Sequence, residues 1–317
     1  MEITVEIILD AQKKIKPHIH HTPVMTSRYV NQITGSEVFF KCENFQKIGA
    51  FKIRGGMNAV LSLPVEKQQK GIATHSSGNH AQAIAYAARQ VNTKAYIVMP
   101  KNSPRVKVDA VKGYGAEIFF CEPTQQARET TLQEVVNRTG AEFVHPYNDD
   151  RVIAGQASCA IEFIEEAGPL DAIITPVGGG GLLSGSLLSA HFFSPQTAVY
   201  AGEPEGAADA ILSMKTGKIE KADFVNTIAD GLLTTLGDKT FPIIRKNVKD
   251  IFPVSDNEII NALRLVYERM KIVIEPSAVV PLAALLNNKE LFSGKKVGII
   301  FTGGNIDLAK LTAWFEK

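Results

Sequence analysis

Short runs of β-branched and aromatic residues alternate with amphipathic helical stretches along most of the 317-residue chain. Such alternation is typical of α/β proteins, in which mainly parallel strands are joined by helical crossovers. By this criterion strands are expected at 37–42, 71–74, 95–99, 117–120, 171–175, 198–201 and 296–301. Between them, apolar residues recur at the three-to-four-residue spacing of helices. We therefore predict an α/β fold with mainly parallel sheets flanked by helices.

The chain length predicts about two domains. Residues 71–147 contain successive strand-helix alternations in a compact block. We expect this block to form a small lobe inserted within a large lobe, which is made of residues 1–70 and 148–317.

Ser255 and Glu258 have the spacing of a capping box, which predicts a helix over the following residues up to 270.

Charge and hydropathy argue against several classes of protein. The chain has 34 basic and 33 acidic residues, so its net charge of +1 gives no general attraction to nucleic acid or to an anionic membrane. No stretch approaches ~20 uninterrupted apolar residues, and the N-terminus is acidic, so neither membrane spanning nor export is expected. Cys42, Cys121 and Cys159 are far apart in apolar surroundings, which predicts buried free thiols and a cytoplasmic protein.

Lys52 follows Phe51 in a segment of apolar and glycine residues, 49–56. Burying a lysine ammonium in such surroundings costs free energy unless its pKa falls or it finds a partner. Lys52 is therefore a candidate amine nucleophile that forms an imine with an aldehyde. Taken alone, the segment is more often a basic turn at the start of a helix.

Four consecutive glycines at 178–181 follow one expected strand and precede an expected helix. Glycine amides can turn inward without hindrance from a Cβ atom, and a helix N-terminus adds positive potential, so the turn is suited to a phosphate. Leu182 and Leu183 stand where a Walker loop has Lys and Ser or Thr, and no acidic ribose partner follows at the dinucleotide-binding spacing. The alternative is a flexible turn.

Two further loops carry polar groups after expected strands. In the first, the Ser76 and Ser77 hydroxyls and the Asn79 amide join the free amides of a helix start, a set that can hold a carboxylate. The alternative is an ordinary helix cap made by Ser77. In the second, residues 302–305, the Thr302 hydroxyl stands beside two glycines that allow close approach.

Four motifs, taken together and in this order, resemble those of the pyridoxal-phosphate enzymes of fold type II. They are Phe-Lys-x-Arg-Gly at Lys52, Ser-Ser-Gly-Asn-His at 76–80, the glycines at 178–181 and Thr-Gly-Gly-Asn at 302–305. The resemblance is greatest to the serine racemase and catabolic threonine (serine) dehydratase family. It implies a tryptophan synthase β-like fold with two lobes, each with a mainly parallel sheet flanked by helices. It also implies that the small lobe lies on the substrate side and that the protein is a homodimer.

The resemblance implies a role for each matching residue. Lys52 would hold the cofactor as an imine, Phe51 would lie against its ring, and Thr302 would face the pyridine nitrogen. Asn79 would bind the ring hydroxyl. The cofactor phosphate would be bound by the amides of Gly178, Gly179, Gly180, Gly181 and Leu182. The substrate would contact Ser76, Ser77, Gly78, Asn79, His80 and Arg128. For Arg128 the alternative is a charge on a helix surface beside Glu129.

The resemblance also implies a divalent cation. Its ligands would be Glu203, the carbonyl oxygen of Ala207, and Asp209. Oxygen ligands without nitrogen or sulfur suit Mg2+ or Ca2+. The alternative is a pair of carboxylates on a solvated helix start.

From these residues we predict a lyase that releases ammonia by β-elimination, converting L-threonine or L-serine to 2-oxobutyrate or pyruvate. Lys52 would remove the Cα proton. The resemblance implies that Ser77, in the position of the family's second acid/base, lies on the opposite cofactor face and would return a proton during racemisation. A serine racemase and an L-threo-3-hydroxyaspartate ammonia-lyase are alternatives, and Ala50 and the run 79–82 favour the second. A non-catalytic metabolite-binding protein would leave Lys52 and Ser77 unexplained.

Overall fold

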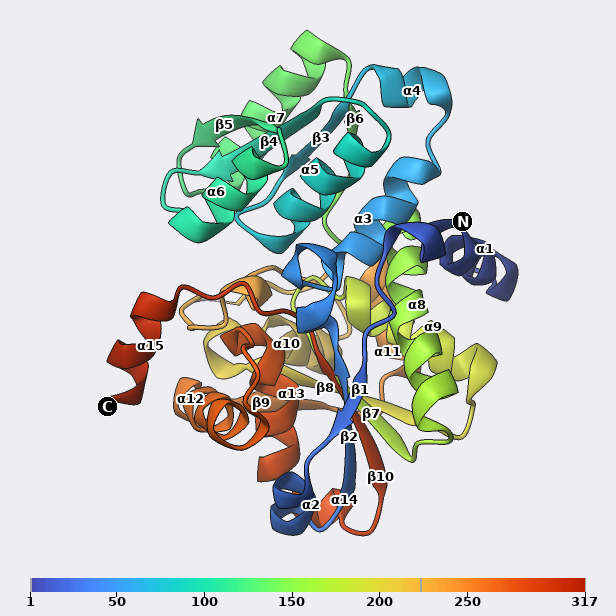
Figure 1. Ribbon diagram of the computed structural model, residues 1–317, viewed down its shortest axis with the longest axis vertical. Helices are drawn as coiled ribbons and strands as arrows, with labels where there is room; N and C mark the ends of the chain where they lie inside the picture. Colours follow the sequence, from blue (N-terminus) through green and yellow to red (C-terminus); the bar gives the residue numbers. More distant parts are fainter. Residues whose placement is uncertain (1, 223, 317) are drawn as a thin grey trace.

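The computed structural model describes residues 2–222 and 224–316, and it has two lobes, each built on its own sheet (Figure 1). The larger sheet has the strand order β1-β2-β10-β7-β8-β9. Its strands are β1 Val24–Thr26, β2 Glu37–Cys42, β7 Ala172–Pro176, β8 Ala198–Pro204, β9 Ile251–Val254 and β10 Lys296–Phe301. All neighbours are parallel except β1 and β2.

The smaller sheet is parallel throughout and has the order β5-β4-β3-β6. Its strands are β3 Ile72–His75, β4 Ala95–Pro100, β5 Glu117–Cys121 and β6 Glu142–Phe143. The central strands β3 and β4 are buried along their whole length, as expected for a sheet covered on both faces by crossover helices.

Helices surround both sheets. Those that precede or cross to the smaller sheet are α1 Val5–Ile15, α2 Arg28–Thr34, α3 Lys52–Leu61, α4 Val65–Gln69, α5 Asn79–Gln90, α6 Arg105–Gly113 and α7 Gln125–Thr139. The remaining ones are α8 Asp150–Ala167, α9 Gly181–Phe193, α10 Asp209–Thr216, α11 Thr240–Asn247, α12 Asp256–Leu265, α13 Pro276–Asn287, α14 Lys289–Phe292 and α15 Leu308–Phe315.

The predicted α/β architecture is confirmed, and each of the predicted strands is present. Three short strands, β1, β6 and β9, were not predicted. The capping box is also confirmed, because Ser255 accepts the Glu258 amide and the Glu258 carboxylate accepts the Ser255 amide. The helix after it departs from the prediction, since α12 ends at Leu265 and residues 266–270 form a turn of π-helix.

Helix α3 lies between the two sheets (Figure 1). Its residues Ile53, Met57 and Val60 pack into the same core as Ile84 and Ile97 of the smaller lobe. The core of that lobe therefore extends beyond the residues 71–147, and the domain boundaries remain a prediction.

Two expectations from composition have structural counterparts. All three cysteines are buried and free, as predicted. Among the described residues, no helix combines the length and the apolar character needed to cross a bilayer.

Candidate active site

A pocket lies at the carboxyl ends of strands from both sheets, where open α/β folds bind their ligands. Its walls are the start of α3, the loop from β3 to α5, the loop from β7 to α9 and the end of β10. All residues predicted to contact cofactor or substrate line this one pocket: Phe51, Lys52, Ser76, Ser77, Gly78, Asn79, His80, Arg128, Gly178, Gly179, Gly180, Gly181, Leu182 and Thr302.

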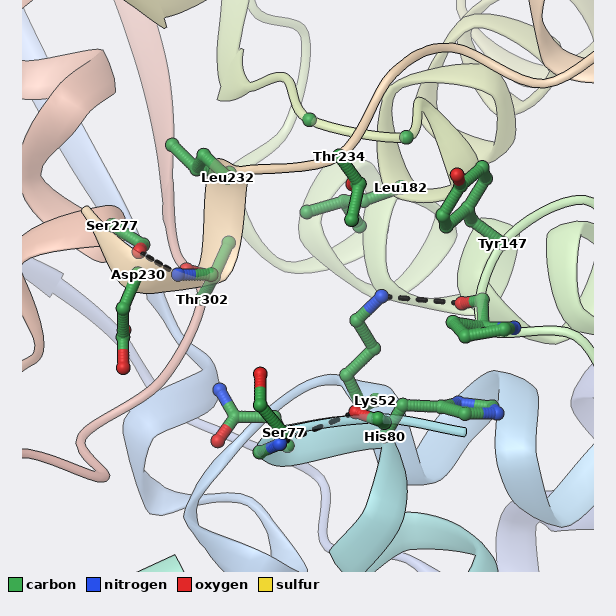
Figure 2. A pocket seen from close by; sticks show the side chains of 18 of the residues that line it. Lys52, Ser77, His80, Tyr147, Leu182, Asp230, Leu232, Thr234, Ser277 and Thr302 are labelled. Atoms are coloured by element: carbon green, nitrogen blue, oxygen red, sulfur yellow. Dashed lines mark hydrogen bonds between the residues drawn. The ribbon is translucent and has the colours of Figure 1, made fainter. Parts of the chain in front are cut away.

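Lys52 is the first residue of α3, and its side chain extends into the pocket (Figure 2). Its Nζ donates a hydrogen bond to the carbonyl oxygen of Pro146 at 3.2 Å and lies 5.2 Å from the centre of the Phe51 ring. Burial lowers the pKa of Lys52 to about 8, although the Glu275 carboxylate acts to raise it. More of Lys52 is therefore neutral and nucleophilic near pH 7 than of a solvated lysine.

The glycine turn between β7 and α9 is shaped by its neighbours as well as by its amides. Gly180 has a φ of 87°, in the left-handed region that favours glycine. A Cβ atom on Gly179 would lie 2.3 Å from the Tyr147 ring, and one on Gly181 would lie 3.0 Å from the Tyr147 Cβ. No side chain caps α9, so its first amides remain available to an anion.

The loop from β3 to α5 leaves its helix amides open in the same way. Gly78 is the N-cap residue of α5 and no side chain caps the helix, so the alternative in which Ser77 is an ordinary cap is wrong. Ser76 accepts the Gly78 amide at 3.2 Å instead. His80 is buried with its Nε2 3.3 Å from the carbonyl oxygen of Val144, and burial lowers its pKa well below the usual value.

Asn79 is held from both sides of its amide. Its Nδ2 donates to Glu275 Oε1 at 2.6 Å, and its Oδ1 accepts from Asn305 Nδ2 at 2.9 Å. One Nδ2 hydrogen remains for a further acceptor, which fits the role predicted for Asn79 toward a cofactor oxygen. Thr302 is buried at the end of β10, and its carbonyl oxygen accepts the Phe51 amide at 3.0 Å.

Several polar, charged and aromatic residues of the pocket were not predicted from the sequence. Lys107 Nζ lies 2.7 Å from Asp230 Oδ2 and 3.6 Å from Glu275 Oε2. Tyr147 and Ser277 line the same pocket (Figure 2). Only Glu275 carried a local signal, because it is a carboxylate inside an apolar stretch immediately before a helix-starting proline.

Arg128 lies on α7 and lines the pocket together with His75 and Gln125. Its Nε is buried and has no hydrogen-bond partner within the described part of the chain. Burial lowers the pKa of His75, and the charge of Arg128 lowers it further, so His75 adds little positive charge of its own. A guanidinium with a free donor at a pocket wall suits a ligand carboxylate.

The residues predicted to hold a cation lie outside this pocket, at the end of β8 and the start of α10. Glu203 and Asp209 are buried, so the alternative of a solvated carboxylate pair is wrong. Glu203 accepts the amides of Ala210 and Ile211 at 2.7 and 2.8 Å. Burial raises the pKa of Glu203 to about 8 and that of Asp209 to about 6. Within residues 2–222 and 224–316, no three His, Cys, Asp or Glu side chains gather to hold a metal.

Comparison with known proteins agrees with this geometry. The family described as "Pyridoxal-phosphate dependent enzyme" matches residues 15–303. The chain is 50% identical to the β-hydroxyaspartate dehydratase of Paracoccus denitrificans, with 97% of this chain and 98% of the relative covered. It is 47% identical to the serine racemase of Dictyostelium discoideum, covering 98% and 97%. The structure of maize serine racemase superposes with a TM-score of 0.96 at 42% identity, covering 100% and 98%.

The two lobes, each with a mainly parallel sheet, and the pocket that contains Lys52 define a fold type II enzyme of the pyridoxal-phosphate class. The chain belongs to the pyridoxal-phosphate-dependent enzyme family. The pocket fits the cofactor, since Lys52 has a lowered pKa and the amides at the start of α9 are uncapped.

Proposed function

We propose that the protein is an ammonia-lyase whose substrate is a 3-hydroxy amino acid with a second carboxylate, of the 3-hydroxyaspartate type. The sequence alone favoured L-threonine or L-serine, and these stay as competitors. The main support comes from Arg128, which lines the pocket and whose buried Nε has no hydrogen-bond partner among the described residues. Serine and threonine have only the α-carboxylate, which the loop before α5 would bind, whereas the β-carboxylate of hydroxyaspartate would pair with this cation. The similarity to a β-hydroxyaspartate dehydratase supports the same substrate class.

The chemistry divides between cofactor and protein. Bound pyridoxal phosphate supplies an aldehyde carbon that takes the substrate amine and a ring that accepts electrons released at Cα. Lys52 and the open amides of α9 would hold it, and the substrate amine would displace Lys52 from the aldehyde carbon and so free the lysine as an amine. Neutral Lys52 would then remove the Cα proton, and the electron pair left at Cα would form the double bond to Cβ as hydroxide leaves. Protonation at Cβ and replacement of nitrogen by water at Cα would give oxaloacetate and ammonia from 3-hydroxyaspartate.

The substrate would be oriented by the small lobe. The hydroxyls of Ser76 and Ser77 and the uncapped amides of α5 suit the α-carboxylate. Arg128 would take the β-carboxylate. Holding both carboxylates fixes the Cα–H bond relative to Lys52, which is how positioning lowers a barrier.

The test measures oxo acid release from three substrates with the purified holoenzyme. We expect oxaloacetate from L-threo-3-hydroxyaspartate to form with at least a tenfold higher kcat/KM than pyruvate from L-serine or 2-oxobutyrate from L-threonine. Arg128→Met should remove this preference by raising KM for hydroxyaspartate, while Arg138→Met, on the exposed end of the same helix, should not. An unchanged preference in Arg128→Met would contradict the proposed substrate class.

Racemisation is the second candidate activity. Ser77 lines the pocket and makes no capping bond, so its hydroxyl is available for proton transfer. The similarity to serine racemases supports this reading. Formation of D-serine from L-serine faster than release of pyruvate would make racemisation the principal reaction on that substrate.

We also propose a structural cation at Glu203, the Ala207 carbonyl and Asp209. Two buried carboxylates in one place repel each other, and a divalent ion would offset that cost. Chelation should lower Tm, and Mg2+ or Ca2+ should restore it. Asp209→Asn should abolish the response to chelator, and a response equal to that of the parent protein would exclude this site.

A further inference from the structure

Lys107 lines the pocket and joins the two lobes by ion pairs. It lies on α6 of the small lobe, and its partners Asp230 and Glu275 belong to the large lobe. Lys107 is 4% exposed. A Cβ atom on Gly78 would lie 2.8 Å from Lys107 Cδ, so the glycine in the substrate loop leaves the space through which the lysine passes.

Glu275 connects this lysine to the cofactor side of the pocket. It is 2% exposed, and its Oε1 accepts the Asn79 Nδ2 hydrogen bond at 2.6 Å. Its other oxygen, Oε2, has no hydrogen-bond partner among the described residues and lies 3.6 Å from the Lys107 ammonium. Lys107 is thus the cation nearest to an otherwise uncompensated buried oxygen.

We propose that Lys107 is a positioning residue that favours the ionised form of Glu275, so that Glu275 can hold the Asn79 amide in the orientation that presents its free N–H to the cofactor. The inference rests on the pyridoxal-phosphate site described above. Lys107 touches neither cofactor nor substrate in this role. It acts across the cleft, so the arrangement of Asn79 depends on the two lobes being together.

The groups around Glu275 act on its pKa in opposite directions. Burial and the Asp230 carboxylate raise the pKa of Glu275 to about 7, whereas Lys107 and the Asn79 hydrogen bond act to lower it. Lys52 is the further cation on this side. Without Lys107 the pKa of Glu275 would rise further, so a larger fraction of Glu275 would be protonated at pH 7, and a protonated carboxyl group no longer serves Asn79 purely as an acceptor.

The experiment is a double-mutant cycle of Lys107→Met and Glu275→Gln, read out by the dissociation constant of pyridoxal phosphate and by the absorption spectrum of its imine with Lys52. One hydrogen bond to the cofactor corresponds to a change of about tenfold in that constant. We expect each single variant to weaken cofactor binding by about this factor and to alter the ratio of the imine absorption bands. In the double variant the effect should equal that of either single variant.

Lys112→Met is the matched control, because Lys112 is an exposed residue of the same helix and should leave both readouts unchanged. If Lys107→Met does not fold, as judged by circular dichroism, Lys107→Gln replaces it with the same expectations. Effects that multiply in the double variant would overturn the proposal, because Lys107 would then act independently of Glu275. So would a spectrum and a dissociation constant equal to those of the parent protein.

Discussion

At the scale of single residues, the catalytic proposal depends on the charge of Lys52. The pKa of Lys52 lies near 8 because burial disfavours the ammonium, while the Glu275 carboxylate favours it. The base must be neutral, so the rate should rise with pH and level off above about 8. Removing the negative charge in Glu275→Gln should lower this pKa and move the rising limb to lower pH. The measurement is kcat against pH, and a limb that moves to higher pH would contradict the assignment.

Ser77 gives a second prediction at this scale. If it supplies the proton on the cofactor face opposite Lys52, Ser77→Ala should lower racemisation of L-serine by at least about 100-fold, the usual range for loss of a general acid. Elimination from L-substrates should fall less than tenfold, because Lys52 still removes the proton. Both rates are measured on one sample, and an equal loss of both would refute a two-base arrangement. Ser76→Ala is the neighbouring control and should not separate the two activities.

At the scale of elements, the turn between β7 and α9 carries a packing constraint in addition to any phosphate contacts. Gly179→Ala would place a Cβ 2.3 Å from the Tyr147 ring, so the turn or the ring must move. We expect the apo-protein to lose about 1–3 kcal/mol of unfolding free energy, as in other overpacked sites. Tyr147→Ala should recover part of that loss in the double variant. Urea unfolding measures both.

The matched control is Gly113→Ala at the end of α6, where an added Cβ would meet no atom within 4 Å. It should change the unfolding free energy by less than about 0.5 kcal/mol. Equal destabilisation by the two substitutions, or no recovery in the double variant, would show that Tyr147 does not set the glycine requirement.

The elements also show how far the sequence could be interpreted in advance. Most of the predicted strands were predictable because nearly all of their residues are buried, so they form nearly continuous apolar runs: β3, β4, β7, β8 and β10. The missed strands are short and depend on distant partners: β1 has three residues and pairs with β2, and β6 has two and pairs with β3. Strand β9 was missed because it contains Pro253, a residue that sheets tolerate mainly at edge strands, and β9 is an edge strand in which Pro253 is exposed.

The site was predictable to a similar degree and for a related reason. Its cofactor and substrate loops follow strands and carry contiguous motifs, so Lys52 and residues 76–80 could be found in the sequence. Lys107 and Tyr147 belong to no motif, because the contacts that define them come from another lobe or from a distant turn. Tertiary packing alone brings them to the pocket.

At the scale of the whole molecule, a buried ion network ties α3, which carries Lys52, to the large lobe. Arg54 is fully buried and makes two hydrogen bonds to Glu43 and two to Glu162, at 2.7 to 2.9 Å. Glu43 lies just after β2, and Glu162 lies on α8. The network therefore fixes α3 against the end of β2, which is near in the sequence, and against α8, which is distant.

Arg54→Met should destabilise the fold by about 3–5 kcal/mol, because it leaves the buried Glu43 carboxylate without its cation and leaves Glu162 paired with Lys41. Arg105→Met, at an exposed surface pair with Asp109, should change stability by less than about 0.5 kcal/mol. The double variant Arg54→Met, Glu43→Gln removes the unpaired charge of Glu43, keeps the pair of Lys41 with Glu162, and should recover more than half of the loss. Urea unfolding at pH 7 measures all three, and a loss in Arg54→Met no larger than in Arg105→Met would show that the network does not hold α3 in place.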